Sequence, residues 1–207
     1  MSLQTLLNVR NTRWLFGAVV TVWWIFIFVG SGGTAMNWSE AIRGTGNLTW
    51  ILLIFVIFIS LLHKLFSRVR LFDLLLPLRK HAGVFAFLVL CSHAAGQFIR
   101  SGVFGDPAAL LAMAFSTRYA MVFGSVAFLI LLPVFLTSTV WAVRTMGYRS
   151  WKNVQRITHV AFVFAALHVG LISYFYRGTI EPGPFVVLGL YVAGYAWLFI
   201  MRRRAQT

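Results

Sequence analysis

Six long apolar segments make up most of this 207-residue chain. Each approaches the roughly 20 residues that an α-helix needs to cross the hydrocarbon core of a bilayer. Only 11% of the residues are charged and 60% are hydrophobic, whereas soluble domains carry roughly 25% charged residues. The sequence therefore predicts an all-α integral membrane protein, with a single domain over residues 1–207. Its six transmembrane helices are expected at residues 13–30, 47–66, 82–100, 118–142, 156–176 and 184–201.

The distribution of charge gives the expected orientation of these helices. Fourteen of the 18 Lys and Arg residues fall on one side of the predicted membrane, and four fall on the other. Because loops rich in Lys and Arg stay in the cytoplasm, we expect both termini to be cytoplasmic and the protein to lie in a bacterial inner membrane, surrounded by lipid. The formal net charge of +14 is then a signal of membrane topology and does not predict nucleic-acid binding.

Two histidines lie at matching depths in the third and fifth segments. His93 and His168 each follow, by about 13 residues, the basic cluster that opens the segment. At 1.5 Å per residue, both lie about 20 Å from the same membrane face. An ionisable side chain inside a membrane is energetically unfavourable and indicates a functional site. We therefore predict that the two imidazoles are the axial ligands of a haem iron. The alternative is a pair of structural histidines that hydrogen-bond carbonyl groups of neighbouring helices.

The other three histidines lie toward the predicted cytoplasmic face. His81 precedes His93 by 12 residues, an offset of about 120° that leaves both on one broad helix face. His159 precedes His168 by 9 residues, an offset of about 180° that points the two to opposite sides of their helix. His81, His159 and His63 are candidates for a second haem or a flavin site. The alternative for each is an interfacial or structural residue.

Polar residues near the segment ends are candidate partners for the anionic groups of a cofactor. Arg100 and Arg118 could bind haem propionates, or could simply anchor the ends of their helices. The triplet Thr137, Ser138 and Thr139 could hold a propionate or a flavin phosphate, although bonding to the local backbone is the more common role in a membrane helix. No CxxCH motif is present, so covalent c-type attachment is excluded and a b-type haem is expected.

The predicted ligands also limit the chemistry. Two axial imidazoles leave the iron no open position, so such a haem transfers electrons and does not activate a substrate. The chain has no GxGxxG dinucleotide fingerprint, and electrons are expected from a quinone or from a cytoplasmic flavin or reductase donor. We predict an electron-transfer subunit with no catalytic residue of its own. The alternatives are a cofactor-free assembly subunit and a small transporter, but no Asp or Glu lies inside a predicted span, as proton or cation transport usually requires.

A series of short motifs resembles the ferric reductase-like transmembrane domain family over about residues 45–175. The third segment opens with Leu78-Arg79-Lys80-His81-Ala82-Gly83, and His93 follows ten residues after that glycine. In the fifth segment, His168 follows Trp151 by seventeen residues. The remaining motifs are Thr45-Gly46, Arg118-Tyr119 with Gly124, Leu136-Thr137-Ser138-Thr139, and Gly147.

In its length and in the turn residues between its apolar segments, the chain is similar to one branch of that family, the haem-binding membrane subunits of periplasmic methionine sulfoxide reductase systems. The resemblance implies that His93 and His168 occupy haem-ligand positions and that a periplasmic, molybdenum-containing methionine sulfoxide reductase accepts the electrons. One position departs from the pattern. Such proteins usually carry a histidine four residues after the tryptophan, where this chain has Gln155, and His159 lies one turn further on. One haem b is therefore expected, and a second haem or an FMN remains an open alternative.

Overall fold

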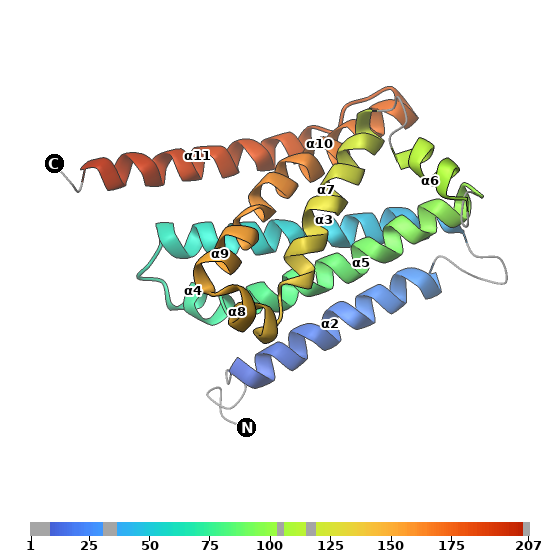
Figure 1. Cartoon of the computed structure of the whole chain (residues 1–207). Coiled ribbons are helices and arrows are strands. Elements are labelled where there is room, and N and C mark those ends of the chain that lie inside the picture. Colours follow the sequence, from blue (N-terminus) through green and yellow to red (C-terminus); the bar gives the residue numbers. More distant parts are fainter. Residues whose placement is uncertain (1–8, 31–36, 103–105, 115–118, 205–207) are drawn as a thin grey trace. The chain divides into compact units, whose positions relative to one another are not determined.

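The computed structural model describes residues 9–30, 37–102, 106–114 and 119–204, and every regular element in these ranges is a helix (Figure 1). Within the described residues, five helices are long and apolar enough to cross a membrane, and a sixth span is present if one strongly bent helix pair is counted. These findings confirm the predicted class, an all-α integral membrane protein. The helices divide into two compact units, Met1–Val56 with Pro77–Ala114, and Ile57–Leu76 with Phe115–Thr207.

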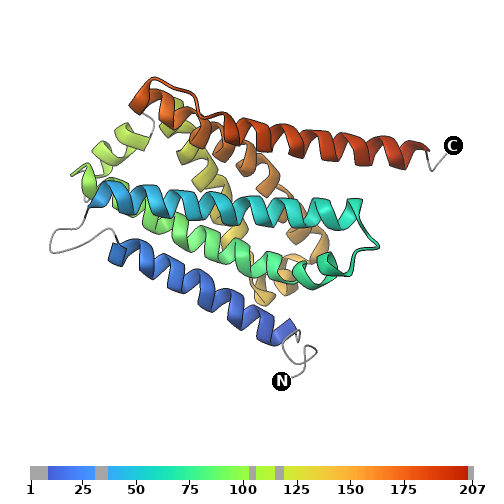
Figure 2. The same ribbon diagram turned by 180° about the vertical axis from the view of Figure 1, so that it is seen from behind.

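The first unit is built around α2 (Val9–Gly30), the first part of α3 (Trp38–Leu65) and α5 (Leu78–Arg100), with the short α6 (Pro107–Ala114) beyond. Helix α2 packs along α5, as both views show (Figures 1 and 2). The indole Nε1 of Trp24 donates a hydrogen bond to Ser92 Oγ at 3.1 Å and links these two helices. Their shared core, to which α3 contributes, consists of Val20, Leu48, Leu52, Ala86 and Val89, with Phe16, Trp24, Ile27 and Phe85 packed against it.

The second unit contains the end of α3, the short α4 (Arg70–Leu75), and α7 (Tyr119–Leu136) through α11 (Pro182–Arg204). Helix α10 (Thr158–Arg177) packs along α7 and also contacts α11. The fully buried ring of Phe162 lies at the centre of this unit, against Phe58 and Tyr191. Gly178 then ends α10 in the left-handed conformation, with φ of 71°.

The fourth predicted segment, residues 118–142, is not one straight helix. Helix α7 ends at Leu136, and α8 (Val140–Met146) leaves at an angle of 85°. Pro133, near the end of α7, has no N–H and so cannot continue the helical hydrogen-bond ladder. Thr139 then takes an extended conformation, and its hydroxyl oxygen caps α8 by accepting a hydrogen bond from the N–H of Ala142 at 3.1 Å. The predicted fourth span therefore corresponds to a helix that ends at Leu136 and a second, sharply bent helix that begins at Val140.

The largest differences between the predicted and observed helix starts occur in the second and fifth segments. Helix α3 begins at Trp38 and not at residue 47. The residues before the predicted start, including Gly44 and Gly46, are part of the helix. In the fifth segment, α9 (Tyr148–Arg156) leads directly into α10, so a helical run extends over Tyr148–Tyr174. Gly147, with φ of 75°, separates α9 from α8. The polar α9 therefore projects from the end of the apolar α10.

Candidate functional site

His93 lies on α5 in the first unit and is held by two features of α3. Its Nδ1 hydrogen-bonds the backbone carbonyl oxygen of Ile42 at 2.8 Å. One helical turn later, Gly46 lies against the same ring: a Cβ added there would come within 2.9 Å of His93 Cε1 and 3.0 Å of His93 Nδ1. Since carbon atoms in contact normally lie about 3.5–4.0 Å apart, only a residue without a side chain leaves room for the ring.

His168 lies on α10 in the second unit and is held in the same way by α7. Its Nδ1 hydrogen-bonds the carbonyl oxygen of Ala120 at 2.6 Å. Gly124, again one turn after the carbonyl, lies against the ring, where an added Cβ would come within 2.8 Å of Nδ1 and 2.9 Å of Cε1. We call this arrangement a histidine seat: a backbone carbonyl that bonds Nδ1, with a glycine four residues later against the imidazole.

The seats determine which tautomer each histidine adopts. A carbonyl oxygen can only accept a hydrogen bond, so Nδ1 of His93 and of His168 must carry the proton. In a neutral imidazole the lone pair is then on Nε2, which is the nitrogen that would bind a metal. Histidines that bind metals commonly donate their other N–H to a carbonyl in this manner, which fixes the orientation of the ring.

A structural histidine would also bond a neighbouring carbonyl, so the hydrogen bond alone does not distinguish the two interpretations. The glycine of each seat adds a second constraint, because it sets how closely the ring approaches the neighbouring helix. The same carbonyl-to-glycine spacing recurs in both units, at Ile42 with Gly46 and at Ala120 with Gly124. This recurrence favours the functional interpretation.

None of the other three histidines shows this arrangement. His63 Nε2 donates to Asp73 Oδ1 at 3.0 Å in an exposed pair. The Nδ1 of His81 is buried and has no hydrogen-bond partner within the ranges that the structure describes. His159 Nδ1 lies 3.1 Å from the hydroxyl of Tyr191 on α11, and the two rings stack. His159 thus contacts α11 while His168 contacts α7, in agreement with the opposite directions predicted for them.

The Thr137–Thr139 triplet uses its hydroxyl groups locally. Thr137 Oγ1 donates to the carbonyl of Pro133 at 2.7 Å, and Ser138 Oγ donates to the carbonyl of Val134 at 2.7 Å. Thr139 caps α8. These bonds match the local backbone role that was the alternative for this triplet. Arg100 is exposed at the end of α5, and Arg118 lies outside the described residues.

Gln155 takes part in a contact that sequence reasoning missed. Its side-chain Nε2 donates to the carbonyl of Val134 and to Thr137 Oγ1, each at 3.2 Å. Trp151 Nε1 donates to the carbonyl of Thr137 at 3.0 Å. The amide that replaces the expected histidine therefore joins α9 to the end of α7. The acceptors are mainly backbone atoms, which leave no signal in the sequence.

Comparison with known proteins places these elements in a family. The model of the family described as "Ferric reductase like transmembrane component" matches residues 45–179, well over half of the chain and a range that includes both seats. No solved structure matches. Proteins named "Protein-methionine-sulfoxide reductase heme-binding subunit MsrQ" are similar along most of their length. The protein from Yersinia pseudotuberculosis (strain IP 31758) is 27% identical, with 95% of this chain and 93% of the relative covered. The one from Yersinia enterocolitica is 26% identical, with 78% and 81% covered. On the strength of the family match, this chain belongs to the ferric reductase like transmembrane component family.

Proposed function

We propose that this chain is the haem-binding membrane subunit of a methionine sulfoxide reductase system and carries electrons to that enzyme. The pair of histidine seats is the observation that carries the proposal, because it presents two imidazoles in the tautomer that a haem iron binds. The names of the MsrQ relatives, which are called heme-binding subunits of a methionine sulfoxide reductase, support it.

In this proposal the Nε2 atoms of His93 and His168 would hold the iron of one b-type haem. When bound, the haem supplies an iron that alternates between the ferric and ferrous states and so carries one electron. The carbonyl oxygens of Ile42 and Ala120 accept hydrogen bonds from the Nδ1–H groups of the two histidines. These bonds orient the rings and make Nε2 a stronger electron-pair donor to a metal. Gln155 supports a count of one haem, because an amide stands where the resemblance calls for a further histidine.

The proposed direction of electron flow follows from the distribution of charge. Fourteen of the 18 cationic residues lie on one side of the spans, and the positive-inside rule makes that side cytoplasmic in a bacterial inner membrane. Electrons then enter from a quinone or from a cytoplasmic flavin or reductase donor. They leave to a periplasmic reductase of the molybdenum-dependent type.

Absorption spectroscopy of the purified protein tests the proposal. After expression with ample haem, the protein should show a Soret band that shifts on reduction with dithionite, at about one haem per chain. His93→Ala and His168→Ala should each remove most of this signal, whereas the matched control His63→Ala should keep it. A colourless protein would refute the haem proposal, and full haem with unchanged spectra in both alanine variants would refute the ligand assignment. A ratio near two haems per chain would refute the count.

A further inference from the structure

Helices α8 and α9 form a second, independent feature, a bend in the chain whose surface has both basic and apolar side chains. Gly147 joins the two helices with φ of 75°, and we call the whole segment, Val140–Arg156, the α8–α9 elbow. On α8 the side chains of Val140 and Trp141 are 60% and 73% exposed. Aromatic and aliphatic side chains of this exposure beside cations are typical of a protein surface at the level of lipid headgroups.

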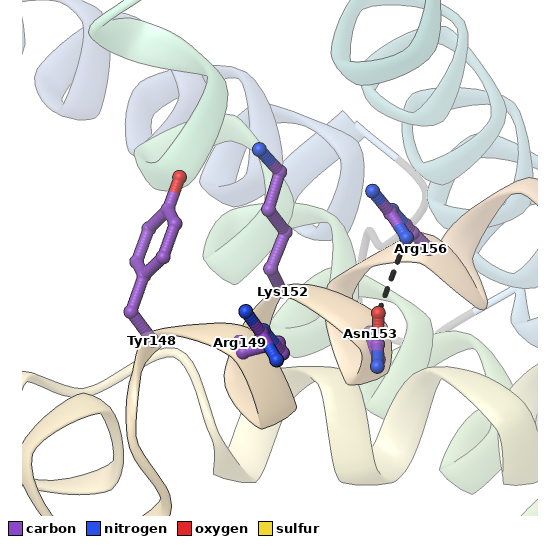
Figure 3. Close-up of a pocket in the computed structure, with 5 residues that line it drawn as sticks. All are labelled: Tyr148, Arg149, Lys152, Asn153 and Arg156. Carbon is purple, nitrogen blue, oxygen red and sulfur yellow. Dashed lines mark hydrogen bonds between the residues drawn. The ribbon is translucent and has the colours of Figure 1, made fainter.

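A pocket of about 530 Å³ opens on the α9 part of the elbow (Figure 3). Three of its five lining residues are cations and none is acidic. The Nζ of Lys152 lies 5.4 Å from the centre of the Tyr148 ring, and Figure 3 shows both side chains standing on the same side of the helix. An Arg156 guanidinium nitrogen donates to Asn153 Oδ1 at 3.2 Å. The lining residues are Tyr148, Arg149, Lys152, Asn153 and Arg156.

The neighbouring face of α9 is hydrogen-bonded to the end of α7. Trp151 and Gln155, which lie between the lining residues in the sequence, donate hydrogen bonds to the end of α7. The cations therefore project from a helix that is held along its neighbouring face. Rigid presentation reduces the loss of side-chain freedom that a ligand would otherwise have to offset on binding.

The length of the helix favours a position for this pocket at the membrane surface. The helical run Tyr148–Tyr174 contains 27 residues, which at 1.5 Å per residue span about 40 Å. The hydrocarbon core of a bilayer is about 30 Å thick. Because α9 is the polar end of this run, it is the part that extends to the headgroup level.

We propose that this pocket binds the phosphodiester headgroup of an anionic phospholipid such as phosphatidylglycerol. Arg149, Lys152 and Arg156 supply N–H donors whose positive charge complements the negative charge of phosphate oxygens. The exposed apolar side chains of Val140 and Trp141 on α8 lie against the acyl region of the same bilayer leaflet. An amphiphile with a phosphate head accounts for both parts of the elbow, whereas a free phosphate would account only for the pocket.

Native mass spectrometry of the full-length protein in detergent tests this proposal by measuring the lipid retained. The pocket variant replaces Arg149, Lys152 and Arg156 together by Gln. The control replaces the three arginines that end α11, Arg202, Arg203 and Arg204, by Gln and so removes the same charge. The pocket variant should retain phosphatidylglycerol at least about tenfold less strongly, and the control should retain it like the unchanged protein. Phosphatidylcholine should bind all three proteins equally weakly.

Three outcomes would overturn the proposal. Equal losses in the pocket and control variants would mean that general charge, and not the pocket, attracts the lipid. No loss in the pocket variant would exclude the site. Displacement of phosphatidylglycerol by millimolar inorganic phosphate would identify a phosphate site and not a lipid site. Lys152→Glu, compared with Arg203→Glu, should give the same order of retention and serves as the test if the triple variant does not fold.

Discussion

Replacing Gly46 by alanine should disturb the His93 seat and little else. The added Cβ would lie 2.9 Å from His93 Cε1, whereas Gly83, on α5, would meet its nearest neighbour, Val56 Cγ2, only at 3.9 Å. Both glycines lie inside helices, so alanine should favour the helix by about 1 kcal/mol at each position. Gly83→Ala is therefore a matched control that changes the backbone preference without touching a histidine.

The size of the disturbance follows from the distances. Relaxed contact between carbons requires 3.5–4.0 Å, so the His93 ring has to retreat by roughly 0.6–1.1 Å. A retreat away from α3 lengthens the 2.8 Å bond from Nδ1 to the Ile42 carbonyl to about 3.4 Å or more, beyond the usual range for N–H···O bonds. Overpacking of this kind costs about 1–3 kcal/mol. Loss of a partner that orients a metal-binding histidine lowers metal affinity by roughly 10–100-fold.

The assay is the haem-to-protein ratio, with the Soret spectrum, after purification in limiting haem. Gly46→Ala should lose most of its haem, and Gly124→Ala should do the same because its Cβ would lie 2.8 Å from His168 Nδ1. Gly83→Ala should keep the haem and melt at the same or a higher temperature. If Gly46→Ala matches Gly83→Ala in haem content, spectrum and melting temperature, the reasoning that links the glycine to the ring is wrong.

Three further changes probe contacts outside the seats. Tyr191→Phe removes the hydroxyl bonded to His159 and should lower the free energy of unfolding by about 1 kcal/mol without changing haem content. A lost Soret band would instead assign His159 to a haem. Trp24→Phe removes the indole donor to Ser92 and should lower the melting temperature with an unchanged spectrum; an unchanged melting temperature would contradict this link. Gln155→Leu should speed hydrogen exchange at the end of α7, measured by mass spectrometry, and protection equal to that of the unchanged protein would refute the bracing role of its amide.

The hydrophobic pattern predicts that this chain forms membrane helices, but it predicts their ends less well. A hydropathy profile averages over a window of residues and carries no information about bends in the chain. The apolar residues after Leu136 were therefore assigned to the same span, although α8 turns away by 85°. The second span was expected to begin only at residue 47, whereas Gly44 and Gly46 both lie inside α3, where side chains from other helices approach closely. Composition alone cannot distinguish a glycine of a turn from a glycine of a close contact.

The two candidate ligands could be identified from their predicted depth in the membrane. The atoms that surround them could not be predicted. His93 and His168 stood out because a polar residue in an apolar segment is conspicuous. The atoms that hold them, the carbonyls of Ile42 and Ala120, belong to the backbone, which every residue shares. The role of Gly46 and Gly124 depends on which helices pack together, and that is a property of the fold.

The helical run formed by α9 and α10 is hydrogen-bonded to α7 at two well-separated points. Midway along α10, His168 bonds the carbonyl of Ala120 near the start of α7. Before α10 begins, Gln155 on the same helical run bonds the carbonyl of Val134 near the end of α7. Sliding or rotation of α10 along α7 would have to break both attachments together. As a ligand of the proposed haem, His168 would change position little when the charge of the haem changes. The proposed electron exchange would then need little rearrangement of the protein around the haem.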